Sequence, residues 1–160
     1  MHTGPLIMGI TGDKDRLDAT TISDTVNTAS RIENLTKYYK AGILLSDATL
    51  KQIDNPDDFH LRYLGKVQVK GKQSSVGIHE CFSGSTEKEI AEKQKTLTLF
   101  NDAMQSYLNR AFASALQAFQ SIAENHPEDL TARFFLNNAN GYLQKGVPDD
   151  WTGVVEVTNK

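Results

Sequence analysis

Two side chains that can hold a phosphate group stand four residues apart in the run DTVNTASR, which spans positions 24–31. Asn27 carries a carboxamide that donates and accepts hydrogen bonds, and Arg31 carries a guanidinium that stays charged and presents five donors. Side chains at i and i+4 lie on one face of a helix, so the spacing predicts that these two project side by side. The pair is a candidate grip for a phosphorylated ligand. The residues predicted to turn toward a core are Val26, Ala29 and Ile32.

The elements that must position this helix are short and rich in β-forming residues. The pattern predicts a buried strand over residues 5–10, an exposed polar loop over 9–20, and a helix that Asp24 caps and that ends before Gly42. The later elements are a strand over 42–46, a short helix over 46–53, a hairpin over 59–71 that turns near Gly65, and a last strand over 74–82. Antiparallel pairs mixed with helices predict an α+β layer.

Helical spacing replaces the strand pattern from about Thr86, where Glu89 three residues on completes a candidate capping box. Another helix is predicted over roughly 128–144, after Pro127, and Trp151 is predicted to anchor an extended tail. The apolar stripes of the first two helices are Phe100, Ala103 and Tyr107, then Ala111, Ala115, Ala118, Phe119 and Ile122. This half resembles one tetratricopeptide repeat with a flanking helix, although Asn109 and Arg110 replace the glycine expected between its helices. One such unit cannot bury its apolar face alone, so we expect it to pack on the first half or on a partner.

Composition narrows the classes of function. The 160 residues carry a formal net charge of -3 and a pI near 5.8, which disfavours general nucleic-acid binding because that affinity comes from surplus Lys and Arg. No window approaches the 18 or more apolar residues of a membrane span. Cys81 is the one cysteine, which excludes an intramolecular disulfide and fits a reducing compartment. We expect a cytoplasmic protein without a membrane segment.

Four ordered motifs resemble the class III nucleotidyl cyclases. They are HTGPLIMGITG at 2–12, DATTISD at 18–24, DTVNTASR at 24–31 and VKGK at 69–72. The resemblance implies the C-terminal part of a ferredoxin-like cyclase palm, a mixed sheet with helices, followed by the small all-α segment. It divides the chain into a cyclase part at 1–84, a linker and helix start at 85–96, and a tetratricopeptide-like segment with its tail at 97–160.

The same resemblance assigns roles in converting ATP to cyclic AMP and pyrophosphate. Asn27 would orient the ribose, and Arg31 would stabilise the charge that develops at the α-phosphate. Lys70, and after it Lys72, would reach the triphosphate, with Gly71 letting the backbone approach closely. Thr20 stands where the family reads the purine, and its hydroxyl can accept from the adenine amino group, so ATP is expected rather than GTP.

The two metal-binding aspartates of that family precede the segment matched by HTG, so no Asp of this chain can take either role. The chain is expected to begin inside the fourth strand of the fold, as a truncated cyclase that is inactive alone. Mg²⁺ or Mn²⁺ would be held in a complete cyclase dimer and not by this chain alone. The partner would be a complementary cyclase half or a second copy. The run from Asp13 to Asp24 departs from a calcium loop at its fifth, sixth and twelfth positions, which are Leu17, Asp18 and Asp24.

Other interpretations stay open on the sequence. Asn27 and Arg31 would equally suit a solvated helix face, Thr20 a polar loop, and the two lysines a protected sheet edge. The cyclase-like part could be a non-catalytic scaffold, with the helical tail binding a partner protein. The helical half alone could bind a peptide in its groove.

Overall fold

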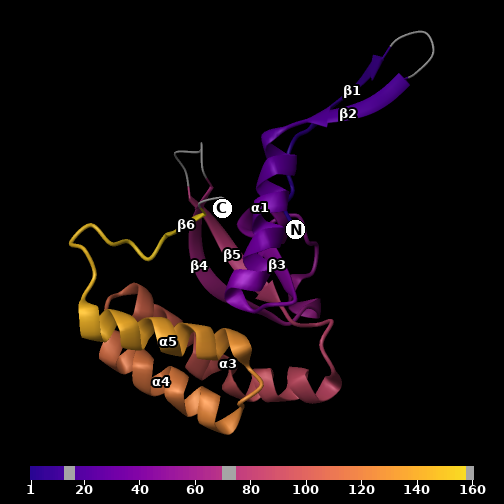
Figure 1. The fold of residues 1–160 in the computed structure, drawn as a ribbon. Coiled ribbons are helices and arrows are strands. Elements are labelled where there is room, and N and C mark those ends of the chain that lie inside the picture. The colour runs from indigo at the N-terminus through magenta and orange to yellow at the C-terminus, as the bar shows by residue number, and fades with distance from the viewer. Residues whose placement is uncertain (13–16, 70–74, 158–160) are drawn as a thin grey trace.

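The computed structural model describes residues 1–12, 17–69 and 75–157. Its elements form an α+β fold, as the sequence predicts (Figure 1). The strands are β1 (Ile7–Gly12), β2 (Leu17–Ile22), β3 (Ile43–Ser46), β4 (Leu61–Val69), β5 (Ser75–Cys81) and β6 (Val155–Val157). The helices are α1 (Asp24–Tyr39), α2 (Asp47–Leu50), α3 (Glu87–Leu108), α4 (Phe112–Asn125) and α5 (Leu130–Lys145).

The main sheet has the strand order β3-β5-β4-β6. β5 pairs antiparallel with β3 on one side and with β4 on the other, and β6 pairs parallel with the end of β4. Helix α1 contacts β3 and α5. The helices α3, α4 and α5 pack in sequence beside the sheet (Figure 1).

The segment predicted as a buried strand is instead one arm of an exposed hairpin. β1 and β2 form a separate two-stranded antiparallel sheet that extends away from the rest of the molecule (Figure 1). Ile7 and Ile10 are 77% and 72% exposed, so the apolar run here is not core. The polar loop predicted over 9–20 is wrong in part, because β1 runs to Gly12 and β2 begins at Leu17.

The N-cap of helix α1 is Ser23, one residue before Asp24, which the sequence predicts as the cap. The hydroxyl of Ser23 accepts hydrogen bonds from the backbone N–H groups of Thr25 and Val26, and Asp24 lies in the first turn instead. The predicted end before Gly42 is right, since Lys40 adopts the left-handed conformation at the C-cap. Val26 is exposed, contrary to the prediction. The buried stripe of the helix is Thr28, Ile32, Leu35 and Tyr39.

The turn predicted near Gly65, in the hairpin expected over 59–71, is wrong, because one continuous strand, β4, runs over Leu61–Val69. β4 passes through Gly65 without reversing, and its pairing with β5 shifts register between Tyr63 and Lys66. Gly65 has φ +101°, so it supplies the backbone conformation that this irregularity needs. A glycine at a β-bulge and a glycine in a tight turn leave the same sequence signal, which explains the error.

The helical half follows the sequence pattern closely. Thr86 and Glu89 form the predicted capping box, each side chain bonding the other's backbone. Phe100, Ala103 and Tyr107 are buried on α3. Ala115, Phe119 and Ile122 are buried on α4, whereas Ala118 is partly buried and Ala111 is exposed as the residue before the helix.

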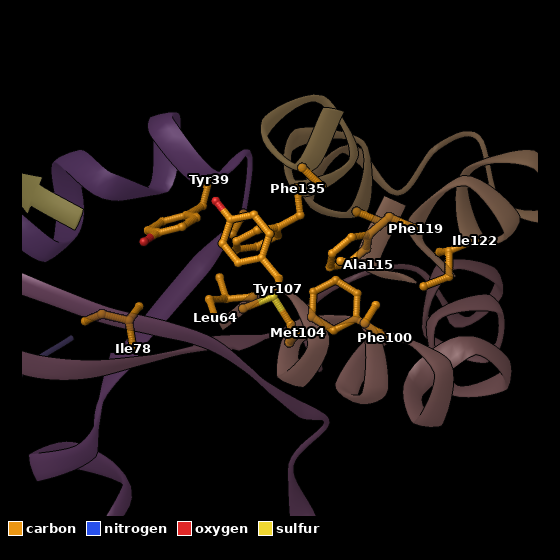
Figure 2. Close-up of a cluster of buried hydrophobic side chains, with 14 of the residues drawn as sticks. Tyr39, Leu64, Ile78, Phe100, Met104, Tyr107, Ala115, Phe119, Ile122 and Phe135 are labelled. Atoms are coloured by element: carbon orange, nitrogen blue, oxygen red, sulfur yellow. The ribbon is translucent and has the colours of Figure 1, made fainter. Parts of the chain in front are cut away.

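One core joins the sheet to these helices. Figure 2 shows Tyr39 of α1, Leu64 of β4 and Ile78 of β5 in the same cluster as aromatic side chains of the helices. Phe119 and Phe135 stack with ring centroids 5.6 Å apart, and Phe100 meets Phe119 edge-on at the same separation. The apolar face that a single helical unit leaves uncovered is therefore covered in part by the protein's own sheet.

The tail is anchored by Trp151, as the sequence predicts. Its ring lies 5.3–5.8 Å from the ring centroids of Tyr107, Phe112 and Tyr142. The guanidinium of Arg110 donates to the backbone carbonyls of Asp149 and Trp151. From this anchor the chain runs on into β6.

Candidate functional site

The start of α1 is fixed by the residues that begin the chain as given. The carbonyl of Pro5 accepts hydrogen bonds from the hydroxyls of Ser23, at 3.1 Å, and Thr25, at 2.6 Å. Gly4 lies so close to this turn that a Cβ at its position would stand 2.7 Å from the hydroxyl oxygen of Thr25. The first motif and the helix that carries DTVNTASR are therefore in direct contact.

The opposite side of the same segment is tied to β3 and α2. The amino group of Met1 donates to the carbonyl of Leu44, and Ser46 N–H donates to the carbonyl of Met1. The imidazole of His2 lies 2.8 Å from the hydroxyl of Ser46. These contacts fix the helix start to the edge of the main sheet, which holds the exposed face of α1 in a defined direction.

Asn27 and Arg31 both lie on α1 within its first two turns, four residues apart as predicted. Asn27 is exposed and Arg31 is half-buried. Between them Thr28 is buried, and its hydroxyl donates to the carbonyl of Asp24 at 2.7 Å. The pair thus borders the buried stripe of α1 rather than forming part of it.

The other predicted residues are placed only in part. Thr20 lies in β2, where its backbone pairs with Gly9, and β2 leads directly into the cap of α1. Its side chain is outside what the structure describes. Lys70 and Lys72 also fall outside the described residues, after the end of β4 at Val69.

The buried charges of the fold lie elsewhere, at the junction of sheet and helices. Arg62 of β4 bonds Glu80 of β5 at 2.6 Å and is also paired with Asp129, the N-cap of α5. Lys93 of α3 completes the cluster with a 2.7 Å bond to Glu80. Sequence reasoning missed this cluster, and the one available signal was a charged residue facing inward on each of two predicted strands.

Each carboxylate of this cluster is matched by a cation. Burial, the largest single influence, raises the pKa of Asp129, but the hydrogen bonds and charge of Arg62, the N–H of Ala132 and the charge of Lys93 together outweigh it and hold that pKa below its ordinary value. Desolvation by itself lowers the pKa of Arg62. Its hydrogen bonds and ion pairs with Asp129 and Glu80 together outweigh this effect, so the pKa is raised above its ordinary value. The cluster is a structural link between sheet and helices.

Comparison with known families identifies the first part of the chain. Residues 1–98 match the family described as the adenylate and guanylate cyclase catalytic domain. The chain belongs to this family. The match includes α1 with Asn27 and Arg31, the strands β1 to β5, and the first half of α3.

Individual relatives agree with the family. The chain is 36% identical over 130 residues to the terminal-differentiation-specific adenylate cyclase of Dictyostelium discoideum, which covers 81% of this chain and 6% of that protein. It is 43% identical over 81 residues to an adenylate cyclase of Anabaena cylindrica, covering 50% of this chain and 16% of the relative. It is 39% identical over 80 residues to adenylate cyclase 1 of Rhizobium meliloti (strain 1021), covering 50% and 12%. The chain therefore spans 6% to 16% of the length of these relatives.

The likeness to the Dictyostelium cyclase extends into the helical half. A stretch that covers 130 of 160 residues necessarily includes positions 31–130, and so it contains all of α3 and α4. The likeness to that relative thus covers the sequence of these two helices and continues at least to the start of α5.

Cyclases of this family generally use Mg²⁺ or Mn²⁺, and the described residues do not fit such an ion. Among residues 1–12, 17–69 and 75–157 there is no group of three His, Cys, Asp or Glu side chains placed to hold a metal. Asp129 and Glu80 are bonded to Arg62, and Asp47 is bonded to His79 at 2.7 Å. No helix of the described part is long and apolar enough to cross a membrane.

Proposed function

We propose that this chain supplies the ribose- and phosphate-binding side chains of an adenylate cyclase site, which converts ATP to cyclic AMP and pyrophosphate. The observation that carries the proposal is that Asn27 and Arg31 lie four residues apart on α1 and border its buried stripe. Asn27 would orient the ribose through its carboxamide. Arg31 would donate to the oxygens of the α-phosphate, where negative charge grows in the transition state.

Substrate choice is assigned to Thr20. A hydroxyl can accept a hydrogen bond from the amino group of adenine, which favours ATP over GTP. Thr20 lies on β2, the strand that leads into Ser23 and so into α1. This short connection supports a common site for the purine, the ribose and the α-phosphate. On the same ground, the hydroxyl of Thr20, we propose that the chain is a member of the Thr-type, ATP-using subset.

Lys70 and Lys72 are proposed to bind the β- and γ-phosphates, with Lys70 the more important. They follow β4, which is held on one side by β5 and on the other by β6. Because β4 is paired on both sides, the position of its end at Val69 is fixed. Lysine at this place would act as a point charge on the leaving pyrophosphate.

The site is proposed to be completed by a second cyclase domain. The metal-binding carboxylates would come from a complementary cyclase half, because a second copy of these 160 residues would bring no Asp for either metal role. On this proposal the 160 residues alone make no cyclic AMP. We place the domain in the cytoplasm, because ATP is found there and its one cysteine, Cys81, is a buried free thiol.

For the helical half we propose a tetratricopeptide-like module that docks a protein partner and regulates the cyclase part. The proposed division is 1–84 for the cyclase part, 85–96 for the linker and helix start, and 97–160 for the helical segment and tail. The likeness to the Dictyostelium cyclase through α4 supports a module that accompanies cyclase domains. Because the sheet and the helices share one core, a partner that binds the helices would also affect the packing of the sheet.

The proposal is tested by nucleotide binding to the chain itself. We expect ATP to bind more tightly than GTP, and Arg31→Ala and Lys70→Ala each to weaken ATP binding by roughly tenfold, the effect of losing one charge-assisted hydrogen bond. Lys88→Ala, a change at an exposed lysine of α3, serves as the matched control. Equal ATP affinity in all four proteins would count against the assignment.

A non-catalytic scaffold is the second candidate. It is favoured by one observation, the lack of any metal-holding group among the described residues. On that account the cyclase part would fix the helices in space and the helices would bind a partner protein. A chain that binds no ATP, but whose residues 85–160 bind the partner that the whole chain binds, would favour the scaffold.

A further inference from the structure

A cleft lies between β4 and α3. It encloses about 500 Å³, which is within the range of small-molecule pockets. Its described lining comes from β4, β5 and α3, with none from α1. β6 pairs with β4 only over Val67–Val69 in the described chain, so it leaves the edge at Leu61 and Tyr63 facing the cleft.

The charged groups at the cleft are already matched. Arg62 reaches the wall, but its guanidinium is bonded to Glu80 and Asp129. His79 lines the other side, and its Nε2 lies 2.7 Å from a carboxylate oxygen of Asp47. A phosphate or carboxylate would therefore meet no uncommitted cation among the described lining residues. The electrostatics favour a neutral ligand.

The remaining polar groups are carboxamides in a row. Asn101, Gln105 and Asn109 follow one another at four-residue intervals along α3 and at its C-cap, so they share one side of the helix. All three side chains are exposed and have no hydrogen-bond partner among the described residues. A carboxamide both donates and accepts, so the row suits a ligand whose edge offers an acceptor beside a donor.

The rest of the lining is apolar or aromatic. Leu61, Met104 and Leu108 form its apolar part, and Met104 also packs in the core with Leu64 (Figure 2). The rings of Tyr63 and His79 lie 5.1 Å apart with their planes tilted by 53°. A flat ring can lie against such walls while its polar edge meets the carboxamides.

We propose that this cleft binds a small, neutral heteroaromatic molecule with an amide-like edge, the class that includes nucleobases and nicotinamide. Such a ligand would contact β4 and α3 together and so stabilise the packing of sheet against helices. The site does not depend on the proposed cyclase chemistry, because it uses none of the residues assigned to ATP. It would be a second, uncharged ligand site on the same chain.

The test is a titration of the ¹⁵N-labelled chain with nicotinamide, followed by NMR. We expect saturable shifts of the side-chain NH₂ signals of Asn101, Gln105 and Asn109. Nicotinate has the same ring with a carboxylate in place of the amide, and we expect it to leave these signals unshifted. No saturable shift with nicotinamide, equal shifts with nicotinate, or shifts confined to other residues would each overturn the proposal.

Variants separate recognition from folding. Gln105→Glu removes the donor with little change in shape and should weaken nicotinamide binding about 3- to 10-fold, the usual effect of one lost hydrogen bond. Gln117→Glu makes the same chemical change at an exposed position of α4 and should leave the affinity unchanged. Asn101→Asp is the second variant should the first not fold. Unchanged affinity in a folded Gln105→Glu or Asn101→Asp protein would also overturn the assignment.

Discussion

Arg62 on β4 holds Asp129 at the start of α5 through two parallel hydrogen bonds, of 2.6 and 2.7 Å, across 67 positions of sequence. Both side chains are almost fully buried. The same guanidinium lies 4.0 Å above the ring of Phe100 on α3. Asp129 also caps α5 by accepting from the N–H of Ala132. A single ion pair thus links the cyclase sheet to two of the following helices.

Breaking this pair should destabilise the whole chain. Asp129→Ala leaves a buried guanidinium with one carboxylate fewer and removes the cap of α5, so we expect the free energy of unfolding to fall by about 3–5 kcal/mol. Urea denaturation measures it. The control is Glu92→Gln, which breaks an exposed 3.2 Å pair with Lys95 and should cost less than about 1 kcal/mol. If the free energy of unfolding fell by a similar amount in the two variants, the buried pair would stabilise the protein no more than the exposed pair.

Stability should also depend on pH through Asp129. Its pKa is held below the ordinary value of 3.8 in the folded protein, because Arg62 stabilises the charged form despite burial. The unfolded chain therefore binds a proton first as the pH falls. The stabilisation is complete well above pH 3.8 and is lost as the pH drops through the folded pKa. Urea unfolding from pH 7 downward should show this loss, and Asp129→Asn, which cannot titrate, should show a smaller one. Identical pH profiles would refute it.

The tail is predicted to depend on Trp151. Its ring contacts those of Tyr107, Phe112 and Tyr142, and it is half-buried. Trp151→Ala should lower the free energy of unfolding by about 2 kcal/mol, less than for a fully buried aromatic residue. It should also make the tail more open to limited proteolysis. Trp151→Phe retains much of the apolar contact and should stay close to the parent chain in both measurements. If the Trp151→Ala protein matched the parent chain in both measurements, residues other than Trp151 would hold the tail in place.

Asn27 should matter little to folding. It is exposed on α1, so Asn27→Ala should change the free energy of unfolding by no more than about 0.5 kcal/mol. Leu35 is buried on the same helix, and Leu35→Ala should cost about 2–5 kcal/mol. Thermal unfolding compares the two. A large loss in Asn27→Ala would assign this side chain to the fold rather than to a ligand.

Much of the secondary structure could be predicted from the sequence, because local signals decide it. The capping box of Thr86 and Glu89 and the stripe from Phe100 to Tyr107 depend on residues a few positions apart. The errors arose where a local pattern has two structural outcomes. Ile7 and Ile10 were predicted to lie in a buried strand, but they lie on an exposed hairpin. Gly65 was predicted to lie in a turn, but it lies within a strand.

The candidate site shows the same division. The spacing of Asn27 and Arg31 on one helix is local and could be predicted. The hydrogen bonds from Ser23 and Thr25 to the carbonyl of Pro5 could not, since they join segments 18 and 20 residues apart. Arg62 and Asp129 are 67 residues apart, and no periodic pattern in the sequence predicts that they pair.

The central claim is that Arg31, with Asn27 beside it, acts on a nucleotide held jointly with another cyclase domain. The direct measurement mixes this chain with the part of the Anabaena cylindrica adenylate cyclase domain that precedes the matched segment, and adds ATP and Mn²⁺. We predict cyclic AMP formation well above that of either polypeptide alone, and a fall of roughly 10²- to 10³-fold with Arg31→Ala. Product formation that is no greater in the mixture, or that is unchanged by Arg31→Ala, would contradict the account.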